Sequence, residues 1–264
     1  EIPDNIPGID EFDPVTGYTR LMRAASIGDL ESVKNYLKGG ASINIQNHEG
    51  NSALMIAAKN GLYHSSLHLI NSGADLNIVN KHGMSALLLA VSSGFNFIIM
   101  SLVNHGAFID SATPDGTTAL MMAAQRGDFE IVKFLLEKGA AINLKNEEKS
   151  TALMFAVSSR EAKVVRLLLE HGASVNLQDE RGFSALSHAA FRGRGEMAAI
   201  LIEYGADIEV KDVFDRTPIM IAIEQSQQTV MDALIGNGCK LPKRGWKASS
   251  EIMKKRQKVL AKMK

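Results

Sequence analysis

The sequence predicts an all-α solenoid in which seven short helix-turn-helix repeats are stacked side by side. Three series of small residues recur every 33 residues without an insertion or deletion. Since one repeat of this length cannot bury the apolar faces of both its helices, stacked neighbours must complete the core. The first series, a glycine that closes each repeat, is Gly40, Gly73, Gly106, Gly139, Gly172, Gly205 and Gly238. The second, ahead of each first helix, is Gly17, Gly50, Gly83, Gly116 and Gly182, with Lys149 and Asp215 in the two remaining positions. The third is Ala24, Ala57, Ala90, Ala123, Ala156, Ala189 and Ala222.

Each repeat carries start and stop signals for two helices. A Ser or Thr hydroxyl stands where it can accept from a free N–H at the start of the first helix. A glycine, which adopts left-handed backbone without strain, ends that helix, and a second helix with paired apolar residues such as Leu135 and Leu136 follows. The expected N-caps are Thr19, Ser52, Ser85, Thr118, Thr151, Ser184 and Thr217. The expected helix-ending glycines are Gly28, Gly61, Gly94, Gly127 and Gly193.

The charge distribution divides the chain into three parts. Residues 1–12 form an acidic arm, and residues 13–242 hold the seven repeats, which start near 13, 46, 79, 112, 145, 178 and 211. Residues 243–264 are predicted to form a basic helix, because residues 240–264 contain ten Lys or Arg and one acid, Glu251. Arg20 and Arg23 in the first repeat, and Ser226 and Pro242 in the seventh, are typical of repeats that close an array.

The framework resembles the ankyrin repeat. The fourth repeat shows the pattern best: residues 115–127 read DGTTALMMAAQRG and residues 131–143 read IVKFLLEKGAAIN. The resemblance covers about residues 13–242 and implies L-shaped repeats of two antiparallel helices with a loop that projects as a β-hairpin finger. Methionine replaces the histidine of the family pattern, and we expect it to fill the core rather than to bind metal. The replacements are Met22, Met55, Met121, Met154 and Met220.

No motif for catalysis or for a cofactor occurs. The glycines lie at repeat positions and match no phosphate-binding loop, dinucleotide fingerprint or zinc-protease motif. His64 and His68 have the spacing of metal ligands but lack a third ligand nearby, and Cys239 is interpreted as a structural thiol. We therefore expect no enzyme activity, no cofactor, no metal and no small-molecule substrate.

The resemblance places partner binding on the finger tips and on the exposed positions of the first helices, along a concave groove. The sixth repeat has aromatic and arginine residues at these positions, and such residues dominate binding hot spots. The alternative is that Phe183 or Phe191 folds inward against its neighbour. The candidate partner-binding residues are Lys59, Gln125, Arg126, Arg181, Phe183, Phe191, Arg192 and Phe214.

The sequence thus predicts a monomeric, cytoplasmic or nuclear interaction module or adaptor that binds another protein, such as an extended peptide segment. Net charge is +0, so the whole molecule is not an electrostatic nucleic-acid or membrane binder. One alternative is that the basic C-terminal helix binds nucleic acid or an acidic membrane surface, or instead caps the seventh repeat. Another is that the chain, which begins at Glu1, is the substrate-recruiting region of a larger protein.

Overall fold

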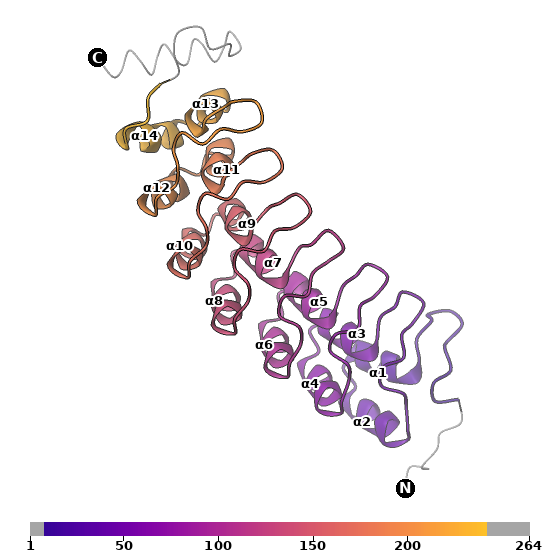
Figure 1. Ribbon diagram of the computed structural model, residues 1–264. Coiled ribbons are helices and arrows are strands. Elements are labelled where there is room, and N and C mark those ends of the chain that lie inside the picture. The colour runs from indigo at the N-terminus through magenta and orange to yellow at the C-terminus, as the bar shows by residue number, and fades with distance from the viewer. Residues whose placement is uncertain (1–7, 242–264) are drawn as a thin grey trace. The chain divides into compact units, whose positions relative to one another are not determined.

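The computed structural model describes residues 8–241, and this part of the chain contains fourteen α-helices and no strand (Figure 1). The predicted all-α repeat fold is therefore confirmed. The basic helix expected at residues 243–264 and the first seven residues of the acidic arm lie outside the described residues.

The chain divides into two compact units. The first comprises residues up to 122 together with 134–140, and the second comprises residues 123–133 together with 141 onward. The division falls inside the fourth repeat, so α7 (Ala119–Arg126) and α8 (Phe129–Glu137) each supply residues to both units.

The helices of the first unit lie in two layers (Figure 1). One layer contains the first helices of the first three repeats, where α3 packs on both α1 and α5. The other contains the second helices, where α4 packs on both α2 and α6. The first helices are α1 (Arg20–Ile27), α3 (Ala53–Lys59) and α5 (Ala86–Ser93). The second helices are α2 (Leu30–Lys38), α4 (Tyr63–Asn71) and α6 (Asn96–Asn104).

The second unit repeats this arrangement. The first helix of the sixth repeat, α11, packs on α9 and α13, and the second helix α12 packs on α10 and α14. The first helices are α9 (Ala152–Ser159), α11 (Ala185–Arg192) and α13 (Pro218–Glu224). The second helices are α10 (Ala162–Glu170), α12 (Gly195–Glu203) and α14 (Gln228–Gly236).

The predicted helix signals are confirmed at most positions. Five N-cap hydroxyls accept the expected backbone N–H, whereas Thr151 and Thr217 occupy the N-cap without a side-chain cap bond. All five glycines expected to end the first helices have positive φ, as does Gly182 ahead of α11. The small alanines at the middle of these helices are buried, which allows neighbouring repeats to approach closely.

Four residues other than glycine adopt the same left-handed backbone. They are Lys149 and Asp215 in the fingers, and Arg160 and Ser226 at the turns between helices, with φ between 59° and 74°. A side chain with a Cβ is strained in this conformation by about 1–2 kcal/mol. Each of these positions is therefore one at which glycine would fit better.

The methionines of the first helices fill the core, as predicted. Met22, Met55, Met121 and Met154 are buried, and Met220 is half-buried. The Met55 sulfur also lies 3.5 Å from the backbone nitrogen of Ser52, so the thioether accepts a weak hydrogen bond at the helix start.

The loops ahead of the first helices are tight turns rather than regular β-hairpins. Two of them contain a single antiparallel bridge, Val79 with Ser85 and Ala112 with Thr118. In several of the loops, including the one bridged by Val79 and Ser85, an Asn or Asp side chain accepts the backbone N–H groups two and four residues further on. These residues include Asn47, Asn80, Asp179 and Asp212.

Neighbouring fingers touch through their backbones. The N–H of Lys81 donates to the carbonyl of Glu49 at 3.1 Å, and the N–H of Val213 donates to the carbonyl of Arg181 at 3.0 Å. Gly182 lies at such a contact, and a Cβ built there would lie 2.9 Å from the Asp212 Cα and 3.0 Å from the Val213 nitrogen. Side chains are excluded here by neighbouring backbone, as well as by the φ of +75°.

Both ends of the described chain pack on the repeats. Ile9 is buried, and the Asp10 carboxylate accepts from the Ser42 backbone N–H at 3.0 Å and from its hydroxyl at 2.6 Å. At the other end, Cys239 is buried beside Glu209, and burial together with that carboxylate raises the pKa of the thiol to about 11.

Candidate functional site

A small hollow lies on the finger and first-helix side of the second unit, between the fifth and sixth repeats. Its volume is about 80 Å³. We call it the repeat-six hollow, and it is lined by Glu148, Ser150, Met154, Phe155, Ser158, Arg181, His188 and Arg192. Helices α9 and α11 and the two fingers ahead of them supply these residues.

One wall of the hollow is held by a chain of hydrogen bonds. The His188 Nε2 lies 2.9 Å from the Asp179 Oδ2, and the His188 Nδ1 lies 3.2 Å from Arg192 NH1. Since a guanidinium can only donate, Nδ1 accepts and Nε2 carries the imidazole proton that Asp179 receives. The buried Asp179 therefore fixes the tautomer of His188, and His188 in turn orients Arg192.

The Asp179 carboxylate also closes its own finger. Its Oδ1 accepts the backbone N–H groups of Arg181 at 2.9 Å and Phe183 at 2.8 Å. Burial raises the pKa of this carboxyl, but the hydrogen bonds from His188 and from the backbone outweigh burial. The pKa of Asp179 lies below its usual value, so the group is a carboxylate at neutral pH.

The prediction that Phe183 is exposed at the surface is wrong. Its ring is buried, as in the inward alternative, because it packs edge-on against His188 at 5.4 Å and against Phe191 at 6.2 Å between centroids. The guanidinium groups of Arg181 and Arg216 lie over it at 5.5 Å and 5.9 Å. Phe183 thus supports the surface residues from below.

Two other predicted aromatic residues do reach the surface of the second unit. Phe191 is 44% exposed and Phe214 is 71% exposed. Arg216 lies 5.1 Å from the Phe214 ring and also forms ion pairs with Asp212 at 2.7 Å and Glu224 at 2.8 Å. These bonds leave Arg216 occupied within its own repeat.

The remaining candidates lie elsewhere. Gln125 and Arg126 are exposed at the end of α7, in the second unit, but do not line the hollow. Lys59 ends α3 in the first unit and is exposed there. The hollow thus brings together Arg181 and Arg192 of the predicted set, with Phe191 packed against Phe183 behind it.

Sequence reasoning missed Asp179, His188 and Glu148. A signal for His188 was present, because the same position of the other first helices holds Ile56, Leu89, Met122, Phe155 and Ile221, or Arg23 in the first repeat. A histidine on a row of mainly apolar residues needs a buried partner. Asp179 is that partner, nine residues earlier in the finger.

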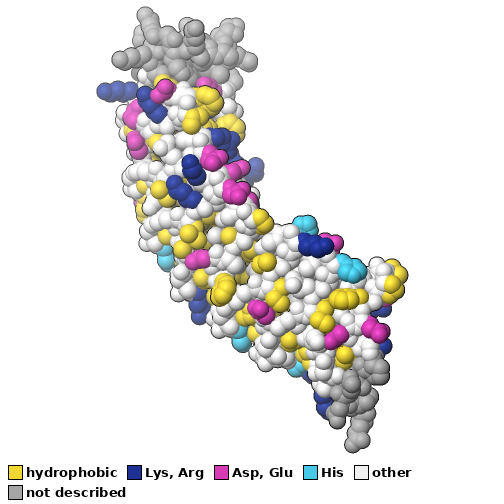
Figure 2. All heavy atoms as spheres, turned by 45° about the vertical axis from the view of Figure 1, so that its right-hand side comes forward, with side chains coloured by type: hydrophobic (Ala, Val, Ile, Leu, Met, Phe, Trp, Pro, Cys, Tyr) yellow, Lys and Arg dark blue, Asp and Glu magenta, His cyan; other side chains and the backbone are white. Residues whose placement is uncertain are grey.

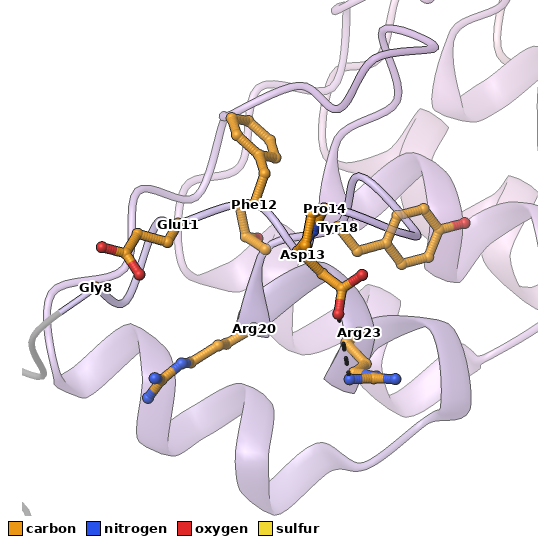
Figure 3. A pocket seen from close by; sticks show the side chains of 9 residues that line it. Gly8, Glu11, Phe12, Asp13, Pro14, Tyr18, Arg20 and Arg23 are labelled. Atoms are coloured by element: carbon orange, nitrogen blue, oxygen red, sulfur yellow. Dashed lines mark ion pairs between the residues drawn. The ribbon is translucent and has the colours of Figure 1, made fainter.

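The first unit has larger but more open hollows. One of about 290 Å³ lies beside the first repeat, where Asp13 points toward Arg23 and pairs with it at 3.9 Å (Figure 3). Another of about 260 Å³ is lined mainly by Tyr63, Phe95 and Phe97.

Within residues 8–241, no three or more His, Cys, Asp or Glu side chains are grouped to hold a metal ion. None of the helices described has the length and apolarity needed to cross a bilayer.

Comparison with known proteins agrees with the geometry. The family model for ankyrin repeats (3 copies) matches residues 21–113, 63–146, 98–179, 140–212 and 176–245. A search of curated protein sequences gave no match.

Three solved structures illustrate the similarity. The human ASB11 ankyrin repeat domain shares 25% identity at a TM-score of 0.75 and covers 85% of this chain and 100% of its own. The ankyrin repeat domain of Bcl-3, described as a unique member of the IkappaB protein family, shares 31% sequence identity at a TM-score of 0.73. The match covers 83% of this chain and 99% of that domain. An ankyrin repeat domain from Acinetobacter baumannii AYE shares 34% sequence identity at a TM-score of 0.68, and the match covers 71% of this chain and 98% of that domain. With a helix-turn-helix pair in each 33-residue period and matching family models from residue 21 to residue 245, the chain belongs to the ankyrin-repeat family.

Proposed function

We propose that this protein is a non-catalytic adaptor that binds a segment of a partner protein at the repeat-six hollow. The observation that carries the proposal is the buried Asp179–His188 pair, which holds Arg192 at the hollow beside the exposed ring of Phe191. Ankyrin-repeat domains are in general protein-interaction modules, so a binding role is the starting expectation for this chain.

The arrangement suits recognition of a side chain from a partner. A guanidinium held by a fixed imidazole loses little conformational entropy on binding, so more of its hydrogen-bond energy appears as affinity. Phe155 lines the hollow and offers apolar surface, and Glu148 and Ser158 offer acceptors. The exposed Phe191 ring, packed on Phe183, offers further apolar surface outside the lining. Arginine and aromatic residues around a small cavity are the composition that hot spots favour.

The proposal extends to the setting in which the protein acts. We infer that the protein acts as a monomer. We infer the cytoplasm as its compartment, in line with the free thiol of Cys239.

The test is capture of the partner by the intact chain and by the variant Phe191→Ala/Arg192→Ala. Truncation of hot-spot residues commonly weakens binding by about 2 kcal/mol or more, so the double variant should lose the partner in a pull-down from source-matched lysate. Both side chains are at the surface, and the denaturation midpoint should stay close to that of the unaltered protein.

A matched control removes the same two residue types, a phenylalanine and an arginine, from a different part of the protein. Phe108→Ala/Arg20→Ala removes an exposed phenylalanine and an exposed arginine from the first unit and should leave capture intact. A truncation after Pro242 removes the basic segment and should also retain the partner. Loss of capture by the truncation alone would move function to the basic segment and refute the proposal.

A further inference from the structure

Three arginines lie at the turns that join the helices of the fifth and sixth repeats. Arg160 follows α9 as its C-cap, Arg192 is the last residue of α11, and Arg194 is the N-cap of α12. All three belong to the second unit. We call them the arginine cluster.

The cluster is electrostatically unfavourable. Burial and the positive charges of Arg160 and Arg192 all lower the pKa of Arg194. The Nε of Arg194 is buried and has no hydrogen-bond partner. A buried donor without a partner destabilises a folded protein, and the loss is larger when the group is charged.

Other arginines of the same unit are neutralised. Arg166 pairs with Glu203 at 3.3 Å, and Arg216 pairs with Asp212 and Glu224. Arg192, by contrast, donates to an imidazole nitrogen that carries no negative charge in the tautomer set by Asp179. The cluster therefore has positive charge in excess of what these bonds balance.

The backbone at Arg160 is strained, as it is at many ligand-binding residues. Arg160 has a φ of 74°, at the turn where Gly28, Gly61, Gly94, Gly127 and Gly193 stand in other repeats. An arginine in left-handed backbone is strained, and such strain is found where a side chain is needed for binding. A glycine would relieve the strain and remove one charge from the repulsive cluster.

We propose that the arginine cluster binds a phosphate group on a side chain of the partner segment. The inference rests on the proposed function, because Arg192 belongs to both the cluster and the repeat-six hollow. Three guanidinium groups match a phosphate monoester, which carries nearly two negative charges and three acceptor oxygens, better than they match one carboxylate. The start of α12 has no side-chain cap, so its first backbone N–H groups add positive potential beside Arg194.

A peptide is a better source of this phosphate than a lipid surface. The exposed acids Glu161 and Glu196 are chain neighbours of the cluster and would repel an anionic bilayer. On the face of the molecule drawn in Figure 2, acidic and basic side chains are interleaved rather than gathered into a broad basic area. A single phosphate on a flexible segment can reach the guanidinium groups without meeting these acids.

The experiment follows the arginine Nε–Hε signals by NMR during titration of the intact protein. The probes are inorganic phosphate, a short phosphoserine peptide, its unphosphorylated form, and anionic phospholipid vesicles. We expect a saturable shift of the Arg194 signal, assigned by its loss in Arg194→Lys, with phosphate and with the phosphopeptide. The Arg166 signal should stay in place, because that side chain is already paired.

The variant Arg160→Gly separates binding from folding. It should weaken phosphopeptide binding by about tenfold or more through loss of one charged hydrogen-bonding group, while raising the denaturation midpoint through loss of strain. Lys149→Gly relieves strain at another left-handed position and should raise the midpoint without changing phosphate binding.

Three outcomes would overturn the inference: no saturable shift at Arg194, equal shifts at every arginine, or undiminished phosphopeptide binding by Arg160→Gly. Binding of vesicles without the phosphopeptide would assign the cluster to a membrane and overturn it as well. If phosphatase treatment of the lysate leaves capture intact while Phe191→Ala/Arg192→Ala abolishes it, the inference fails and the proposed function stands.

Discussion

Replacing Gly182 with alanine is expected to lower the free energy of unfolding by about 2–5 kcal/mol. Left-handed backbone at a residue with a Cβ accounts for about 1–2 kcal/mol of this. The rest, about 1–3 kcal/mol, comes from forcing a methyl group against atoms that cannot move aside. The Cβ would lie 2.9–3.0 Å from the backbone of Asp212 and Val213, in the next finger. Urea denaturation followed by circular dichroism measures the change.

The matched control for this change is Gly172→Ala. Gly172 has a φ of +88°, but no atom lies within 4 Å of a Cβ built there. Only the backbone strain of about 1–2 kcal/mol remains, so the control should lose clearly less stability. Equal losses in the two variants would show that fingers do not restrict each other through their backbones.

Replacing Asp179 with alanine is expected to destabilise the protein by about 3 kcal/mol or more, since it removes one partner of a buried charged network. The substitution leaves the His188 imidazole and the backbone N–H groups of Arg181 and Phe183 without their acceptor. The exposed Asp207 makes a similar turn with the N–H of Glu209, and Asp207→Ala should lose less than about 1 kcal/mol because water replaces the bond. Denaturant titration of both variants makes the comparison.

The Asp179 carboxylate also makes the stability of the folded protein depend on pH in the acid range. The pKa of Asp179 is lower in the folded protein than the unfolded value of about 3.9. Its contribution is therefore complete above about pH 4 and is lost as the pH falls through the lower folded value. Asp179→Asn should flatten the acid side of the stability profile. An unchanged profile would mean that the carboxylate is not held in this network.

Asp179→Asn also tests how Arg192 is positioned. An asparagine amide facing His188 donates, so the imidazole proton moves to Nδ1, which then cannot accept from Arg192. We expect weaker partner binding in a variant whose finger keeps its backbone hydrogen bonds. Asn47 and Asn80 hold the corresponding fingers of the second and third repeats in the same way.

The fold could be predicted almost completely from the sequence, because each framework residue has a local structural role, such as capping a helix, and that role recurs in each of the seven repeats. In the second repeat, Ser52 caps the start of α3, Ala57 in its middle allows close packing, and Gly61 follows its end in left-handed backbone. The ankyrin resemblance implied β-hairpin fingers, but the structure has tight turns instead. Side chains such as Asn47 accept backbone N–H groups that would otherwise be free to pair between two strands.

The candidate site was only partly predictable. Arg192 and Phe191 stand at surface positions of the first helix, which the 33-residue register identifies. The inward turn of Phe183 depends on His188 and on the two guanidinium groups that cover its ring, and a register carries no information on such contacts. Arg160 lies at a turn between helices, outside the surface rows that the resemblance singles out.

The single cysteine of the chain gives the last repeat a chemical reporter of its own. Alkylating reagents attack the thiolate, and a buried Cys239 with a pKa of about 11 presents almost none at neutral pH. Arrays of repeats can open from their ends while the remainder stays folded. The rate at which Cys239 is labelled would therefore follow the fraying of the seventh repeat, free of interference from any second thiol.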